Sequence, residues 1–93
     1  MQTVGRREAT AKIINKKGLH ARASAKLVEA AARFQSHITV TKDGQTVDAR
    51  SIMGLMMLAA GFGSEITIVA EGVDAEEAMT AILALIDAKF GED

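Results

Sequence analysis

A histidine and an arginine stand two residues apart in the segment 18–22, Gly-Leu-His-Ala-Arg, directly before a run of helix-forming residues. A helix N-terminus presents unpaired backbone N–H groups and the positive end of the helix dipole, so an anion is stabilised there. A neutral imidazole is a nucleophile that can carry a phosphoryl group. A guanidinium can bind phosphoryl oxygens through a fork of donors. The spacing therefore predicts a phosphoryl site with His20 as the acceptor and Arg22 as the stabilising residue.

The composition restricts the other functions that the chain could have. Its 93 residues predict one domain, and the absence of cysteine excludes disulfides and thiolate metal sites. A net charge of −1 and only three aromatic residues argue against nucleic-acid binding. The longest nearly apolar stretch, 52–62, is too short to span a bilayer, and residues 1–7 lack the apolar core of a secretory signal. We expect a cytoplasmic, monomeric protein that needs neither a metal nor another cofactor.

The first half of the chain predicts a strand followed by a helix. Residues 1–7 carry no periodicity and are expected to form a flexible tail before a domain that spans 8–93. Residues 8–14 alternate as in a strand, and the polar segment 15–18 reads as a turn. The composition of 21–34 favours a helix. Its expected apolar stripe consists of Leu27, Ala30, Ala31 and Phe34.

The second half predicts a hairpin, a short helix, a strand and a long helix. Segments 37–42 and 45–49 alternate around Asp43-Gly44, a dipeptide typical of hairpins. Ser51 is a candidate N-cap for a helix over 51–58, and a fourth strand is expected over 64–71. Asp74 and Glu77 form a variant capping box for a helix over 75–90. The expected buried residues are Ile38, Val40, Val47 and Ala49 in the hairpin, Ile66, Ile68 and Ala70 in the fourth strand, and Met79, Ile82, Leu83, Ile86 and Phe90 in the last helix.

This order, β-α-β-β-α-β-α, predicts an α+β fold in which amphipathic helices cover one face of a four-stranded sheet. The short helix is unusually apolar, with five apolar residues in the six from Ile52 to Met57. They cannot all point inward from one short helix. Some must be exposed, and adaptable methionine side chains suit transient docking to several partners.

Two segments give the chain a strong resemblance to a known family. Residues 18–22 (GLHAR) resemble the active-centre motif of HPr, the histidine-containing phosphocarrier family of the bacterial phosphoenolpyruvate-dependent phosphotransferase system. Residues 51–56 (SIMGLM) resemble the regulatory-serine segment of that family, at the family's distance from the histidine. The resemblance runs from residue 8 to about residue 90.

The resemblance implies a fold, partners and residue roles. It implies a two-layer open-faced sandwich whose antiparallel sheet has the order 1-4-2-3, with three helices on one face. His20 would take a phosphoryl group from enzyme I through Nδ1 and pass it to enzyme IIA-type acceptors, with Arg22 beside it. Ser51 would be the target of an ATP-dependent, serine-specific HPr kinase. The residues placed at the partner-docking surface are Ile52, Met53 and Met56.

One departure from the family pattern concerns the residue after the arginine. The family commonly has proline there, which presets φ in the first helical turn, whereas this chain has Ala23. Alanine has high helix propensity, so the helix should survive. The substitution bears instead on how rigidly the His20 loop is held, and hence on transfer rate or partner choice.

Three functions remain open at this level. The first is a phosphocarrier, a substrate-like carrier rather than a stand-alone enzyme, in a sugar-uptake or a regulatory, nitrogen-related system. The second is a regulatory protein-binding module switched by phosphorylation of Ser51. The third is a small-molecule-binding α+β domain, for which only His20 and Arg22 offer polar ligands. The other histidine, His37, has no motif around it and is expected to be an ordinary surface residue.

Overall fold

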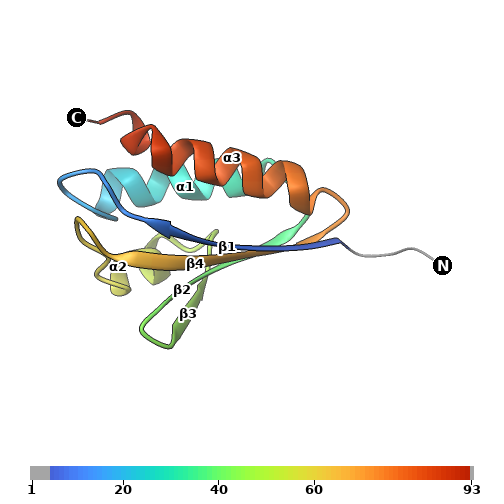
Figure 1. The fold of residues 1–93 in the computed structure, drawn as a ribbon, viewed down its shortest axis with the longest axis horizontal. Helices are drawn as coiled ribbons and strands as arrows, with labels where there is room; N and C mark the ends of the chain where they lie inside the picture. Colours follow the sequence, from blue (N-terminus) through green and yellow to red (C-terminus); the bar gives the residue numbers. More distant parts are fainter. Residues whose placement is uncertain (1–4, 93) are drawn as a thin grey trace.

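The computed structural model describes residues 5–92, which form four strands and three α-helices in the predicted order (Figure 1). The sheet is antiparallel and has the strand order β1-β4-β2-β3. The predicted α+β sandwich is therefore confirmed. The elements are β1 (Gly5–Lys12), α1 (Ala21–Ala32), β2 (His37–Lys42), β3 (Gln45–Asp48), α2 (Ile52–Met57), β4 (Glu65–Gly72), α3 (Ala75–Asp87) and a final 3-10 turn, η1 (Lys89–Gly91).

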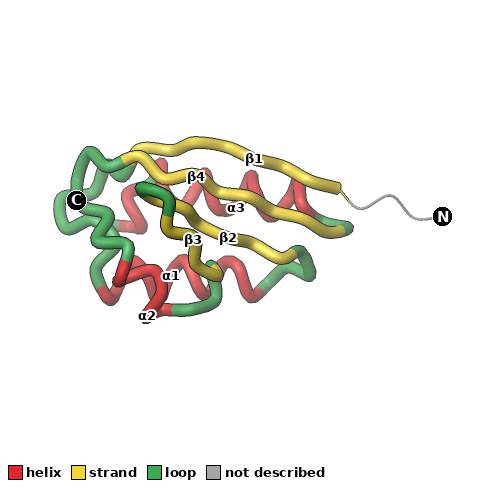
Figure 2. The backbone as a smooth tube through the Cα atoms, turned by 90° about the horizontal axis from the view of Figure 1, so that it is seen from below, coloured by secondary structure: helices red, strands yellow, loops and turns green. Residues whose placement is uncertain are grey.

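The two long helices lie side by side on one face of the sheet, and the opposite face is open (Figures 1 and 2). The short helix α2 packs against α1 and against the edge strand β3. Alternation along the strands sends one set of side chains toward the helices, so the core forms between the two layers. The buried apolar residues include Ile38, Val40, Ala49, Ile66, Ile68, Ala70, Leu27, Ala31, Met79, Ile82, Ile86 and Phe90, while Val47, Phe34 and Leu83 are partly buried against them.

The first strand begins earlier than its sequence pattern predicts. β1 starts at Gly5, which pairs with Gly72 of β4, and it ends at Lys12. The expectation of a tail over 1–7 is therefore wrong for residues 5–7, and residues 1–4 lie outside the described part of the chain. Arg6 and Arg7 gave no strand signal because this half of the edge strand is mostly exposed. The pairing with β4 sets the length of β1.

The start of α3 also differs from its prediction. Asp74 precedes the helix but makes no side-chain cap. Its carboxylate instead accepts hydrogen bonds from the backbone N–H groups of Gln35 and Ser36, at 2.8 and 2.9 Å, and from the Ser36 hydroxyl. The predicted capping box is therefore wrong, because a tertiary contact to the α1–β2 connection uses the carboxylate oxygens.

The topology brings three chain segments to one end of the molecule. The turn before α1, the loop after α2 and the C-terminal residues all lie at the left end in Figure 1, and Figure 2 agrees. The start of α1, which carries His20, is at this end. Within residues 5–92, no helix combines the length and the apolar character needed to cross a membrane.

Candidate phosphoryl-transfer site

A tight loop holds the residues before His20 in place. Gly18 has φ +65°, and a Cβ there would lie 2.4 Å from the carbonyl oxygen of Ala60. The next residue, Leu19, donates its N–H to that same carbonyl oxygen at 2.9 Å. Glycine is therefore required at position 18 both for its left-handed backbone and for the close approach to the loop after α2. This contact fixes the loop from which His20 projects.

His20 occupies the N-cap position of α1, as the sequence predicts. Its backbone is extended, and its carbonyl oxygen accepts the N–H of Ser24 at 2.8 Å. The buried Ser24 hydroxyl donates back to the Leu19 carbonyl oxygen at 3.1 Å. Helix α1 thus forms with Ala23 in place of the family's usual proline, and Ala23 is itself fully buried. The Ser24–Leu19 hydrogen bond ties the first helical turn to the loop, a restraint that does not depend on proline.

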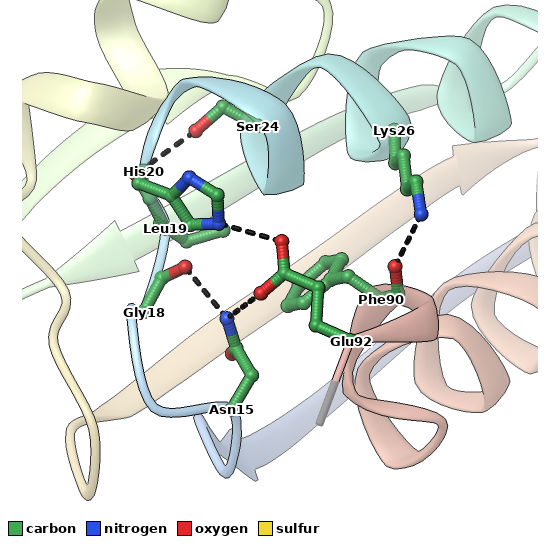
Figure 3. Close-up of polar contacts among 8 residues, drawn as sticks. All are labelled: Asn15, Gly18, Leu19, His20, Ser24, Lys26, Phe90 and Glu92. Carbon is green, nitrogen blue, oxygen red and sulfur yellow. Dashed lines mark hydrogen bonds and ion pairs between the residues drawn. The ribbon is translucent and has the colours of Figure 1, made fainter.

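Within the described part of the chain, the imidazole of His20 is held through one ring nitrogen, Nε2 (Figure 3). Nε2 lies 2.6 Å from Oε2 of Glu92, and the two side chains are 28% and 14% exposed. Within residues 5–92, Nδ1 makes no hydrogen bond. Because an ionised carboxylate can only accept, Nε2 must be the donor in this pair. When the ring is neutral, Nδ1 therefore carries no proton and holds the lone pair.

Glu92 is in turn held by Asn15. The buried Asn15 amide donates from Nδ2 to Glu92 Oε1 at 3.0 Å and to the Gly18 carbonyl oxygen at 2.8 Å. Partial burial raises the pKa of the Glu92 carboxyl. The hydrogen bonds from Asn15 and His20, with the charges of His20 and Arg22, outweigh that effect and hold the pKa below its ordinary value of 4.5. Glu92 is therefore ionised at neutral pH.

The turn η1 after α3 places Glu92 beside His20. Lys89 and Phe90 have left-handed backbones, at φ 57° and 56°, and Gly91 follows at 75°. The Phe90 ring is completely buried, and its carbonyl oxygen accepts a hydrogen bond from Lys26 Nζ of α1 at 2.6 Å. Two consecutive left-handed residues other than glycine are unfavourable unless other contacts hold them. Here the ring and the lysine contact fix the turn.

An open cleft of about 370 Å³ surrounds the imidazole. Its lining is dominated by cations, and Glu92 is its one acidic side chain among the described residues. Arg22 is exposed on the first turn of α1 and makes no hydrogen bond or ion pair within residues 5–92, so its donors can bind a ligand. In the same described range, no three His, Cys, Asp or Glu residues are grouped to hold a metal ion. The lining residues are Lys16, Lys17, His20, Arg22, Lys26, Gly91 and Glu92.

The second predicted segment forms α2, and Ser51 is its N-cap. The Ser51 hydroxyl oxygen accepts the N–H of Gly54 at 2.9 Å, as expected. Leu55 points into the core, whereas the neighbouring apolar side chains are exposed, with Met53 at 71%. The prediction that the helix cannot bury all its apolar residues is therefore confirmed. The exposed residues are Ile52, Met53, Met56 and Met57 on the helix and Phe62 on the following loop, and we call these five the apolar patch.

The loop after α2 connects the apolar patch to the active-centre loop. Phe62 lies in that loop, two residues beyond Ala60, which accepts the Leu19 N–H. The sequence alone did not single out Met57 and Phe62, although both are large apolar residues next to the predicted docking set. His37, by contrast, begins β2 with an exposed side chain whose Nε2 lies 3.5 Å from Asp48 Oδ2, so it is a surface residue outside the cleft.

Two functional candidates, Asn15 and Glu92, were missed at the sequence level. Asn15 read as a turn residue, and Glu92 lies at the end of the chain with no motif around it. They lie 77 residues apart in sequence. No periodicity or local spacing indicates such a contact.

Comparison with known proteins identifies the family to which this chain belongs. Residues 7–88 match the model of a family described as PTS HPr component phosphorylation site. The chain belongs to the HPr family. The phosphocarrier protein HPr of Cupriavidus necator is 59% identical over 80 residues, which cover 86% of this chain and 90% of that protein. The phosphocarrier protein NPr of Shewanella violacea is 46% identical, with coverage of 86% and 88%.

The fold comparison agrees with this assignment. The crystal structure of HPr-C-His from Thermoanaerobacter tengcongensis superposes with a TM-score of 0.90 at 48% identity, covering 94% of this chain and 98% of that one. The described fold, with its strand order β1-β4-β2-β3, is therefore the fold of the HPr family.

Proposed function

We propose that this chain is a phosphocarrier that accepts a phosphoryl group on Nδ1 of His20. The observation that carries the proposal is the pairing of Nε2 with Glu92, which leaves Nδ1 without a hydrogen-bond partner among the described residues. Nδ1 then holds the lone pair that nucleophilic attack on phosphorus requires. The membership of the chain in the HPr family supports the same role.

The surroundings of His20 suit a transferring phosphoryl group. Phosphoryl transfer depends mainly on positioning and on stabilisation of charge. The first N–H groups of α1 and the positive end of its dipole lie directly after His20. Arg22 extends from that same turn, and Lys16, Lys17 and Lys26 line the cleft. In this proposal Arg22 binds the phosphoryl oxygens, and the lysines add a positive field around them.

The donor in the proposal is phosphorylated enzyme I, and the acceptors are enzyme IIA-type proteins. The reaction moves one phosphoryl group from a partner to His20 and then to another partner. The chain thus acts as a carrier rather than as a stand-alone enzyme, in the cytoplasm. The apolar patch beside the active-centre loop is the proposed docking surface, with Ile52, Met53 and Met56 at its centre. Both a sugar-uptake system and a regulatory, nitrogen-related system use this chemistry.

Regulation through Ser51 is the second candidate function. Ser51 is only partly buried, and it begins the helix that carries most of the apolar patch. A phosphate there would be accepted by the helix N-terminus and would add negative charge beside the docking surface. A serine-specific HPr kinase would supply it. This role is compatible with carrier function, and the alternative is a purely regulatory binding module in which His20 is not used.

Incubation with enzyme I and phosphoenolpyruvate tests the carrier function. Wild type and His37→Ala should each gain one phosphoryl group, whereas His20→Ala should gain none. The bond should be labile in acid and stable in alkali, as expected of a phosphoramidate. Mass spectrometry of the intact protein measures the uptake, and normal labelling of His20→Ala would refute the assignment.

A further inference from the structure

Glu92, the last described residue, is the one acidic side chain that lines the cleft within residues 5–92, and the other charged residues of the lining are cationic or histidine. A carboxylate beside the proposed phosphoryl site would repel an approaching phosphoryl group, so its presence there calls for a compensating role. The two carboxylate oxygens of Glu92 have separate partners. Oε2 lies 2.6 Å from His20 Nε2, and Oε1 accepts a hydrogen bond from Asn15 Nδ2 at 3.0 Å. The carboxylate therefore contacts the side of the ring away from the lone pair on Nδ1 (Figure 3).

We propose that Glu92, oriented by Asn15, is a positioning residue that holds His20 in the Nε2–H tautomer and so makes Nδ1 the nucleophile. This inference rests on the proposed phosphocarrier function. It assigns part of the active centre to the last turn of the chain, far in sequence from the motif that contains His20.

The orientation of Asn15 supports this assignment. Its Nδ2 donates to two acceptors, Glu92 Oε1 and the Gly18 carbonyl oxygen, so the amide cannot be reversed without losing both bonds. In this orientation Asn15 Oδ1 is buried and has no hydrogen-bond partner among the described residues. A buried unpaired acceptor is unfavourable. The loop therefore keeps Asn15 oriented as a donor toward Glu92, at the cost of leaving one acceptor unpaired.

The backbone of the last turn supports it as well. The left-handed residues Lys89 and Phe90 redirect the chain after α3, so that Glu92 returns to the start of α1. The buried Phe90 ring and the Lys26 contact hold this turn. Unfavourable backbone conformations of this kind persist only where several surrounding contacts hold them in place, and they are concentrated at functional sites.

The chemistry of transfer gives the carboxylate a second effect. As Nδ1 attacks, its lone pair forms the N–P bond, and the bond from phosphorus to the donor atom of enzyme I breaks with its electron pair remaining on that donor atom. Nε2 keeps its proton, so the ring becomes positively charged, and the Glu92 carboxylate stabilises that charge. In onward transfer the N–P bond breaks and its electron pair returns to Nδ1. Neither step needs a proton to move at Nε2.

The test uses the full-length chain labelled with ¹⁵N. Long-range ¹H–¹⁵N spectra of the His20 ring identify its tautomer, and rapid-quench measurements give the rate of phosphoryl uptake from enzyme I. Wild type should show the Nε2–H tautomer. Glu92→Gln and Glu92→Ala should show mixed tautomers and take up phosphoryl on the order of tenfold more slowly, because a hydrogen bond to a charged group is lost. Both substitutions should lower kcat and leave KM unchanged, because the docking surface is not altered.

Glu77→Gln is the matched control, because it removes one exposed carboxylate from α3 outside the cleft. It should leave the tautomer and the rate as in wild type. Glu92→Asp, which keeps the carboxylate, should recover part of the rate. The inference is overturned if wild type is phosphorylated while both Glu92→Gln and Glu92→Ala keep the Nε2–H tautomer and the wild-type rate. Failure of wild type to accept phosphoryl would instead refute the carrier function itself.

Discussion

Lys26 Nζ of α1 lies 2.6 Å from the carbonyl oxygen of Phe90, so the first long helix and the last turn of the chain are joined directly. The same Phe90 places its ring in the core with no exposed surface. Its polar backbone and its apolar side chain thus anchor one turn from two sides. That turn positions Glu92 at His20, so a change in core packing at Phe90 should also displace Glu92 from the His20 ring.

Truncation of the buried ring provides the first prediction. Phe90→Ala should lower the free energy of unfolding by about 3–5 kcal/mol, because a large side chain is lost from the core and a cavity remains. Denaturant titration measures the change. The matched control is Phe62→Ala, because Phe62 is 68% exposed and its removal should alter stability by only about 0.5 kcal/mol or less. Equal effects of the two substitutions would contradict the anchoring role of Phe90.

Much of this architecture could be predicted from local patterns. The apolar stripe of α1, the Asp43-Gly44 hairpin and the Ser51 cap all depend on residues within a few positions of one another. The family motif at His20 is also local, and the structure places it at the helix start as expected.

The remaining features depend on contacts between distant segments. The extension of β1 to Gly5 follows from its pairing with Gly72, since the exposed arginines of this edge strand carry no apolar pattern. Asp74 has the residue type of a helix cap, yet its oxygens bind Gln35 and Ser36. The approach of Glu92 to His20 depends on two left-handed residues that are not glycine, for which the sequence gives no signal.

The second prediction concerns Arg22. Its guanidinium is exposed and makes no hydrogen bond within the described residues, so Arg22→Ala should leave stability within about 0.5 kcal/mol of wild type. Loss of its charge-assisted hydrogen bond to the phosphoryl group should slow transfer in both directions by roughly tenfold to a hundredfold. Arg22→Lys should recover only part of the rate, because an ammonium lacks the planar fork of donors.

Rapid-quench kinetics with enzyme I measure both directions of transfer. Arg33→Ala is the matched control, since it removes an exposed arginine from the other end of α1. Transfer rates in Arg22→Ala that match those of Arg33→Ala would show that Arg22 is only a solvated surface residue.

The third prediction follows from the pKa of Asp74. The Ser36 hydroxyl and then the Gln35 N–H hold the pKa of this carboxyl below its ordinary value of 3.8, against the smaller opposing effect of partial burial. A group with a lowered pKa in the folded state contributes stability above its unfolded pKa and loses that contribution as pH falls through the folded value. Wild type should therefore be more stable than Asp74→Asn at neutral pH, by an amount that stays constant down to about pH 5.

Below that pH the difference should shrink as Asp74 becomes protonated in the wild type. Urea titrations of both proteins from pH 7 to pH 2 measure it. Asp43→Asn serves as the control, because Asp43 is an exposed hairpin residue that pairs only with its neighbour Lys42 among the described residues. A difference between wild type and Asp74→Asn that does not vary with pH would contradict the role assigned to the ionised carboxylate.

The last prediction concerns the apolar patch and the serine at its edge. Ser51→Asp should leave the melting temperature nearly constant, because aspartate is itself a good N-cap and its charge is favourable at a helix N-terminus. It should nevertheless weaken exchange with enzyme I, since a negative charge now lies beside Ile52 and Met53 where a partner must displace water. Met53→Asp should weaken exchange through loss of apolar contact. Each defect should raise the apparent KM for the carrier more than it lowers kcat, as expected when docking rather than chemistry is impaired.

Val73→Asp is the control for added charge on an exposed apolar residue. Val73 is 70% exposed, close to the 71% of Met53, but it lies in the connection from β4 to α3 at the opposite end of the molecule (Figure 1). Its substitution should leave both KM and kcat unchanged, because no docking surface is proposed there. Titration of the carrier against a fixed amount of enzyme I gives the two constants for all three variants. If Ser51→Asp and Met53→Asp both behave like Val73→Asp, α2 is not the docking surface, and the exposure of its methionines needs another explanation.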